Sequence, residues 1–153
     1  MSGTLIKDVH VEKLAPMRVA SLSVTSESPE QEAIDQLIAW ARPLGQLNHP
    51  FRFFGYDNCQ PHPNHKYTTW ITIEPWVGRS GGIDIIDFPG GCYATLDCEG
   101  VEAIGPGWNE LVGWLKDSNY TYGEQPSLEE HLDVLDGQQH FKLYLSITPS
   151  PLI

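Results

Sequence analysis

Basic residues are scarce in this chain of 153 residues, which has 9 Lys and Arg against 20 Asp and Glu and a formal net charge of −11. A chain this acidic cannot replace the counterions of a phosphate backbone over a broad face, so we expect no direct nucleic-acid binding. Anionic membrane surfaces are unsuitable partners for the same electrostatic reason. The charge instead favours cationic partners.

Cysteine is also rare, because Cys59, Cys92 and Cys98 are too few and too scattered to form a disulfide framework. No apolar run approaches the roughly 18 residues that a membrane-spanning helix needs. The N-terminal sequence lacks the apolar core and the cleavage site of a secretory signal, so we expect a cytoplasmic protein. The length and the 41% of apolar residues suit one globular domain with its own core.

Recognisable catalytic and metal motifs are missing as well. His49, His62 and His65 have no zinc-type spacing and no Cys pair to support them, so they indicate a polar loop. There is no Gly-rich phosphate loop and no nucleophile motif. We therefore expect no metal and no cofactor. Pro and Gly cluster at 58–65, 77–82 and 105–107, which we interpret as loops or turns.

The hydrophobic pattern predicts the order β, β, α, β, β in the first half of the chain. Strands Val9–Leu14 and Arg18–Val24 are expected to form a hairpin around Pro16. A helix follows, with Ser28 as its N-cap and Pro29 at its first position. Strands at Phe51–Tyr56 and Tyr67–Trp76 complete this half.

The second half repeats that order. Strands Ile83–Phe88 and Cys92–Leu96 form a second predicted hairpin, around Pro89-Gly90-Gly91. The remaining predicted elements are a helix and two strands, at Trp108–Leu115, Ser127–Asp133 and Phe141–Thr148.

Matching residues of the two halves are separated by a constant number of positions, which we call the offset. The separation from Trp40 to Trp114 equals the separation from Pro75 to Pro149. Seven pairs share this offset, so we predict an internal repeat at about residues 5–77 and 81–150. The expected fold is α+β, with duplicated βαββ modules related by a pseudo-two-fold axis. Each module has an antiparallel sheet and one main helix, and a ligand cleft is expected between the modules. Trp40 and Trp114 are interpreted as helix–sheet packing residues.

An ordered set of segments spans almost the whole chain and resembles the GyrI-like small-molecule-binding domain, the effector-binding domain of AraC- and MerR-type transcription regulators. The segments are VEKLAPMRVASL, LIAWA, FGYDN, IDIIDFPGGCYATLDCEG, WNELVGWLKDSNY, PSLEEHLD and FKLYLSITP. Many members of that family carry a DNA-binding domain before this one. Here the resemblance begins by about residue 5, so we expect a single stand-alone effector-binding domain over residues 1–153.

The resemblance also implies a site. The family carries an acidic residue in a segment of the form P-x-(F/L)-E-x-Y-L, which corresponds here to Pro126–Leu132 and makes Glu129 the matching residue. His131 departs from the pattern, because the family has Tyr at that place, and a His can change its charge near neutral pH. A carboxylate among aromatic rings attracts lipophilic cations.

Aromatic residues are the second signal for a ligand site, although core packing explains each one at least as well. The candidates that we expect to contact a ligand with Glu129 and His131 are Phe54, Tyr56, Trp70, Tyr93, Trp108 and Tyr144. Strand alternation places Trp70 on the face opposite Thr69 and Ile71.

Three functions follow from these features. The favoured one is binding of a small hydrophobic, cationic or neutral ligand, which the protein would sequester or sense, as in multidrug binding. The second is a protein–protein interaction, either with DNA gyrase, which some relatives inhibit, or with a separate regulator. The third, less favoured, is hydrolysis of reactive electrophiles by Glu129 as general acid or base, paired with Tyr56, Tyr93 or His131.

Overall fold

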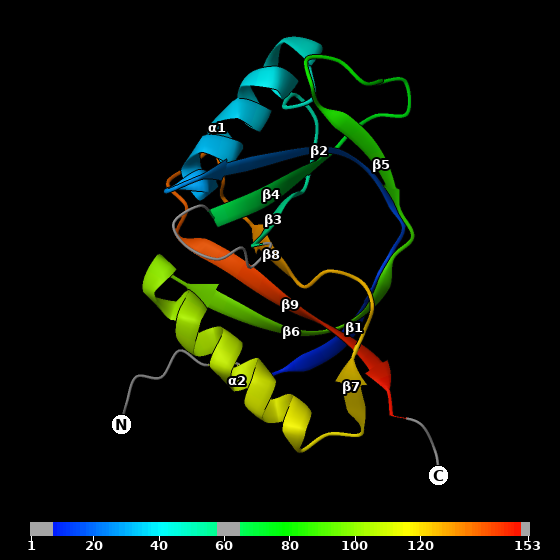
Figure 1. Cartoon of the computed structure of the whole chain (residues 1–153), viewed down its shortest axis with the longest axis vertical. Helices are drawn as coiled ribbons and strands as arrows, with labels where there is room; N and C mark the ends of the chain where they lie inside the picture. The colour runs from blue at the N-terminus through cyan, green and yellow to red at the C-terminus, as the bar shows by residue number, and fades with distance from the viewer. Residues whose placement is uncertain (1–7, 58–64, 151–153) are drawn as a thin grey trace. The chain divides into compact units, whose positions relative to one another are not determined.

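The structure, a computed structural model, describes residues 8–57 and 65–150 (Figure 1). Contacts within the chain divide it into two compact units. Unit 2 is the continuous segment Pro16–Pro89, and unit 1 combines Met1–Ala15 with Gly90–Ile153. Each unit pairs one α-helix with antiparallel strands, so the predicted α+β class is confirmed. Apart from His65, the predicted loop at 58–65 lies outside the described residues.

Unit 2 is a four-stranded antiparallel sheet with α1 (Pro29–Ala41) packed on β2 and β4. Its strands have the order β3-β4-β2-β5, with bounds β2 (Met17–Ser26), β3 (Phe53–Asp57), β4 (His65–Thr72) and β5 (Asp84–Phe88). Ser28 and Pro29 occupy the predicted N-cap and first helical positions. Ala33, Ile34 and Leu37 are among the helix residues that are buried.

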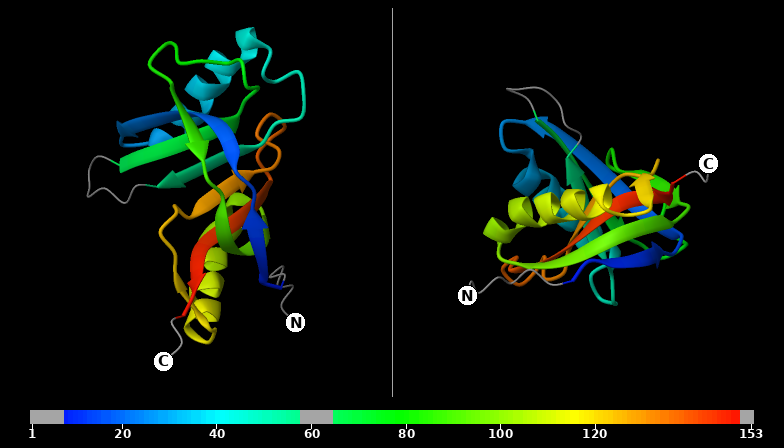
Figure 2. Two further views of the ribbon diagram at one scale, coloured as in Figure 1. Left: turned by 90° about the vertical axis from the view of Figure 1, so that its right-hand side faces the viewer. Right: turned by 90° about the horizontal axis from the view of Figure 1, so that it is seen from below.

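Unit 1 repeats this layout around α2 (Ile104–Lys116). Its strands have the order β1-β6-β9-β8, with bounds β1 (His10–Leu14), β6 (Gly91–Glu99), β8 (Leu128–His131) and β9 (His140–Pro149). A short strand, β7 (Tyr120–Tyr122), pairs with the C-terminal end of β9. Figure 2 shows α2 lying along β6 and β9, which it contacts. The buried core between them consists of Ala94, Leu96, Cys98, Leu111, Leu115, Phe141, Leu143, Leu145 and Ile147.

The strand pairings recur at the same constant offset that relates the two halves of the sequence. In unit 2, Trp70 pairs with Ser21 on one side and with Phe54 on the other. In unit 1, Tyr144 pairs with Thr95 and with Leu128. Equivalent residues of the two halves therefore occupy equivalent places in the two sheets.

Both predicted hairpins are wrong, because β1 pairs with β6 and β2 pairs with β5. Only Ala15 and Pro16 separate β1 from β2, and they offer neither the two positive φ angles of a type I′ turn nor the Gly that begins a type II′ turn. Pro89 and Gly90 separate β5 from β6, and Gly90 has a φ of 86°. This dipeptide suits the central positions of a type II turn, which splays the flanking strands apart.

Helix α2 begins at Ile104 rather than at the predicted Trp108, and it therefore includes the predicted turn at 105–107. Pro106 is compatible with this start, because the first N–H groups of a helix have no partner inside it. A Cβ atom at the buried Gly107 would lie 2.8 Å from both Cys98 Sγ and Leu143 Cδ1, so glycine lets the helix approach the sheet. The patterns also missed β7, and they extended β4 beyond its end at Thr72.

Candidate functional site

Strand β8 carries two adjacent carboxylates on opposite faces of the unit 1 sheet. Successive side chains alternate along a strand, and Glu129 pairs with Leu143 whereas Glu130 pairs with Lys142. Leu143 belongs to the core under α2, so Glu129 lies on the helix face. There, the Nε1–H of Trp108 donates a hydrogen bond of 3.2 Å to Glu129 Oε2. The structure thus joins these two predicted site residues on the side of the sheet that α2 covers.

The face away from α2 holds a compact cluster of an acid and two tyrosines. The phenol of Tyr144 donates a hydrogen bond of 2.6 Å to Glu130 Oε1. The ring of Tyr93 meets that of Tyr144 edge to face, with 5.7 Å between the centroids. All three side chains are buried, and Glu130 is only 6% exposed. Of the predicted aromatic residues, Tyr144 therefore bonds to Glu130, and Tyr93 packs against Tyr144.

An ion pair borders this cluster. Lys142 Nζ lies 2.9 Å from Glu12 Oε2 and 5.4 Å from the centroid of the Tyr144 ring. Burial acts to raise the pKa of Glu12, but hydrogen bonds from Thr95 and Lys142 outweigh it and hold that pKa below its ordinary value. Glu12 therefore stays ionised at neutral pH and balances the charge of Lys142.

Tyr93 ties the cluster to the segment that leads into β8. Its hydroxyl donates a hydrogen bond of 2.9 Å to the carbonyl oxygen of Pro126, two residues before Leu128. Burial raises the pKa of the Tyr93 phenol, so the group remains a protonated donor over the physiological pH range. Burial and this hydrogen bond hold the Tyr93 ring in place.

His131 lies on the same face as Glu129, away from the tyrosines. Its Nδ1 is 2.8 Å from Gln138 Oε1, and its ring meets that of Phe141 edge to face. Burial lowers the pKa of His131 despite the opposing influence of nearby acids, so the imidazole is neutral at pH 7. The structure does not bring His131 to the two tyrosines.

The remaining predicted residues share one face of unit 2, opposite α1. Thr69 bonds to the carbonyl oxygen of Ala33 on α1, so its neighbour Trp70 points to the other face. Tyr56 meets Trp70 edge to face at 5.6 Å, and Phe88, which the sequence analysis did not single out, lies 5.2 Å from Trp70. Phe54, the strand partner of Trp70, is stacked under the guanidinium of Arg52, with 5.0 Å from Cζ to the ring centroid.

The sequence analysis did not single out Glu130, although the repeat offset relates this residue to an aromatic residue of unit 2. At that offset, Glu130 corresponds to Tyr56, which lies on the aromatic face of unit 2, whereas Glu129 corresponds to Gly55. The offset therefore relates Glu130, and not Glu129, to the aromatic face of unit 2.

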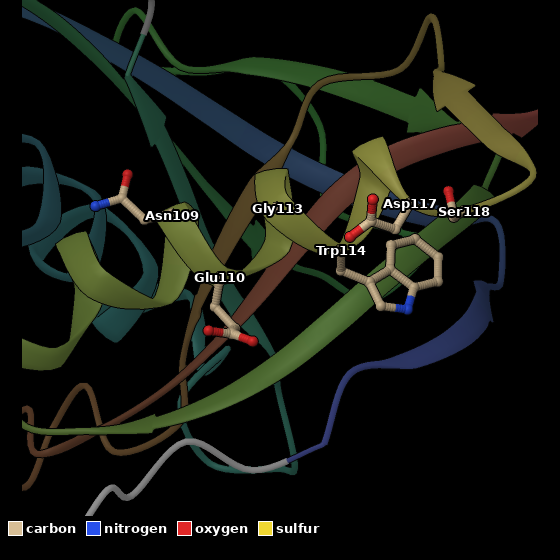
Figure 3. A pocket seen from close by; sticks show the side chains of 6 residues that line it. All are labelled: Asn109, Glu110, Gly113, Trp114, Asp117 and Ser118. Atoms are coloured by element: carbon tan, nitrogen blue, oxygen red, sulfur yellow. The ribbon is translucent and has the colours of Figure 1, made fainter.

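Among the hollows that described residues of unit 1 line, two are free of every predicted site residue. One, of about 360 Å³, lies on the outer surface of α2 beside Gly113, Trp114 and Asp117 (Figure 3). The other, of about 320 Å³, is lined by the ends of β6 and β9 and by the β8–β9 turn, and it includes Asp133 and His140. Trp114, interpreted as a packing residue, is half-buried against the core and stacks on Tyr120.

Metal and membrane features were searched over residues 8–57 and 65–150. In that part of the chain, no group of three or more His, Cys, Asp or Glu side chains could hold a metal ion. No helix there is long and apolar enough to cross a membrane. His62, one of the three histidines considered above, is not among the described residues.

Comparison with known proteins identifies the domain. The family model of the GyrI-like small molecule binding domain matches residues 7–145. No curated protein sequence matches the chain.

Solved structures share the fold at low sequence identity. The EcmrR C-terminal domain has a TM-score of 0.77 and 12% identity, and the match covers 95% of this chain and 99% of that domain. In the EcmrR–DNA complex, the chain spans only 58% of the EcmrR chain's length. SAV2435 bound to tetraphenylphosphonium has a TM-score of 0.56 and 13% identity, covering 93% and 94%. A hydrolase from Listeria innocua has a TM-score of 0.64 and 9% identity, covering 93% and 92%.

Proposed function

The chain belongs to the GyrI-like small-molecule-binding domain family, and from that premise we propose that it binds a lipophilic, cationic ligand. The observation that carries this proposal is the buried cluster of Glu130, Tyr144 and Tyr93 in unit 1. A carboxylate and a cation about 5 Å apart attract by about 3 kcal/mol at an effective dielectric constant of about 20. Aromatic faces add cation–π attraction and exclude water.

Glu130 takes the role of counter-ion in this proposal, in place of the Glu129 that the family motif indicated. Glu129 accepts a hydrogen bond from Trp108 on the helix face, whereas Glu130 accepts one from Tyr144 on the opposite face. Phe54, Tyr56 and Trp70 remain proposed ligand contacts on unit 2. A structural neighbour that binds tetraphenylphosphonium supports this choice of ligand class.

The experiment compares two isosteric variants on opposite faces of one strand. We would titrate tetraphenylphosphonium into the wild type, Glu130→Gln and Glu129→Gln by calorimetry. Glu130→Gln is expected to weaken binding at least about tenfold, which corresponds to about 1.4 kcal/mol. Glu129→Gln, the matched control, is expected to leave the affinity within about threefold.

Each other outcome has a definite meaning. Loss of binding in Glu129→Gln alone would return the role to the residue that the motif indicated. Equal binding by all three proteins would remove the carboxylate from the mechanism. No binding and no thermal stabilisation by this or other lipophilic cations would contradict the proposed function, since saturating ligand should stabilise the fold by about 2.7 kcal/mol at 100 times its Kd.

Hydrolysis is a second candidate, which the contact between Glu130 and the Tyr144 phenol favours. A carboxylate and a phenol 2.6 Å apart can act as general base and proton donor toward an electrophile. A structural neighbour that is described as a hydrolase is consistent with this chemistry. Mass spectrometry of reactive electrophiles incubated with the wild type and Glu130→Gln tests it, because turnover should disappear in the variant. Interaction with gyrase or with a separate regulator remains a prediction from the sequence alone.

We further infer that the domain arose by duplication of a βαββ module, at about residues 5–77 and 81–150. The recurrence of the strand pairings at the constant offset supports this origin. The compact units differ from those sequence repeats in one respect, because β1 belongs to unit 1 and β5 to unit 2. In this proposal the first strands of the two modules are exchanged.

A further inference from the structure

The indole N–H of Trp70 is a buried hydrogen-bond donor without an acceptor. Trp70 is only 4% exposed, and its Nε1 has no hydrogen-bond partner among the described residues. Two other indoles differ: Trp40 Nε1 donates to Ser80 Oγ at 2.9 Å, and Trp108 Nε1 donates to Glu129. Native proteins leave few buried donors unsatisfied, because each one costs about 1–3 kcal/mol.

The surroundings of Trp70 hold its ring in place while they leave that donor unused. Tyr56 contacts the indole edge to face at 5.6 Å, and Phe88 lies against it at 5.2 Å. In the sheet, Trp70 is flanked by Phe54 on β3 and by Ser21 on β2. An indole fixed in this way presents its N–H in one orientation, so an acceptor that reaches it gains a directional bond at little cost in side-chain entropy.

We propose that the ligand of this protein carries a hydrogen-bond acceptor, which the Nε1–H of Trp70 binds. The inference rests on the proposed function, because it concerns the chemistry of the same ligand. The ligand class is then a lipophilic cation with an ether, carbonyl or ring-nitrogen acceptor, and not a cation built only of hydrocarbon groups. Tetraphenylphosphonium lacks such an acceptor, so it cannot pair with the Trp70 donor.

A site that binds an acceptor through a buried donor distinguishes ligands that have the acceptor from ligands of the same shape that lack it. Replacing an acceptor by a C–H group leaves the protein's buried donor unpaired, which costs more than the loss of a solvent-exposed bond. The net gain is limited, because the acceptor gives up its own hydrogen bond to water. The expected preference is therefore about three- to tenfold.

The experiment uses ligands that differ by a single ring atom. Benzyltriphenylphosphonium is compared with the 2-, 3- and 4-pyridylmethyl triphenylphosphonium ions, in which a ring nitrogen replaces one C–H group. At least one pyridyl isomer is expected to bind the wild type about three- to tenfold more tightly than the benzyl ion. In Trp70→Phe this preference should disappear, so that the pyridyl isomer and the benzyl ion bind with affinities within about threefold of each other.

Trp40→Phe is the matched control, because it removes an indole of the same unit whose N–H already has a partner. The preference for the pyridyl isomer should survive in Trp40→Phe. The indole N–H resonance of Trp70, assigned by its loss in Trp70→Phe, should move downfield with the pyridyl isomer and not with the benzyl ion.

Failure of this inference is distinct from failure of the proposed function. If the wild type binds all four ions equally well, the protein does not recognise the acceptor and this inference is wrong, whereas the proposed cation binding is supported. If the preference persists in Trp70→Phe, another donor provides it and the assignment to Trp70 is wrong. If none of the ions binds, the proposed function is contradicted and this inference with it.

Discussion

Tyr144 of β9 and Glu130 of β8 lie on the face of the sheet away from α2, and the Tyr144 hydroxyl donates a hydrogen bond of 2.6 Å to the Glu130 carboxylate. Both side chains are buried. Hydrogen bonds to charged groups contribute more than neutral ones, and a buried carboxylate depends on each donor that it has. The pair therefore contributes to the stability of unit 1 as well as to its proposed ligand chemistry.

Tyr144→Phe should lower the free energy of unfolding by about 1.5–3 kcal/mol, because it removes one donor from a buried carboxylate and leaves the ring in place. Urea denaturation measures this change. Tyr122→Phe is the control, since Tyr122 is 61% exposed and its variant should stay within about 0.5 kcal/mol of the wild type. Equal stabilities for the two variants would show that the hydrogen bond is energetically unimportant.

The local patterns of the sequence were sufficient to predict most elements. Ser28, Pro29 and the apolar stripe that includes Leu37 predict α1, because capping and side-chain period involve residues only a few positions apart. The structure has that helix. The alternation around Trp70 likewise placed it on the face opposite Thr69. These features depend on side-chain period and capping, which the chain encodes locally.

Features that depend on tertiary pairing could not be obtained in the same way. Apolar alternation predicts that β1 and β2 are strands, but it does not say which strands they pair with. Only the turn residues Ala15 and Pro16 argue against a β1–β2 hairpin. The choice between the two acids of β8 stays a prediction, because a shift of one residue on a strand moves a side chain to the opposite face. Glu129 and Glu130 are chemically identical, so only the strand register distinguishes them.

Two glycines of α2 should respond in opposite ways to the same substitution. Gly113→Ala adds a methyl group where no atom lies within 4 Å, so the variant should gain about 1 kcal/mol of helix propensity. Gly107→Ala places the methyl group 2.8 Å from Cys98 Sγ and Leu143 Cδ1, which should cost about 1–3 kcal/mol through overpacking. Thermal unfolding measures both changes, and stabilisation by Gly107→Ala would contradict the close contact between α2 and the sheet.

Asp133 should titrate below the ordinary range of an aspartate. Its slight burial acts to raise the pKa, but bonds from the His140 backbone and side chain and from the Gln139 backbone outweigh this and lower the pKa. The stability that this carboxylate contributes is present above its unfolded pKa and is lost as the pH falls through the lowered folded value. Carbon-detected NMR of the carboxyl group measures this titration. In His140→Ala the pKa should rise only part of the way, because the bond from the Gln139 backbone remains.

His131 should make the protein less stable in mild acid. Burial lowers its pKa in the folded state, against the opposing influence of Gln138, Glu129, Asp133 and Glu130. The folded state therefore binds fewer protons than the unfolded state below the unfolded pKa of about 6.5, and the free energy of unfolding falls with pH from there down to the lowered folded pKa. The slope from this one group cannot exceed about 1.4 kcal/mol per pH unit. Urea denaturation between pH 7.5 and pH 5 should show this decline in the wild type and a flatter profile in His131→Gln. A wild-type decline that persists in His131→Gln would assign the effect to another group.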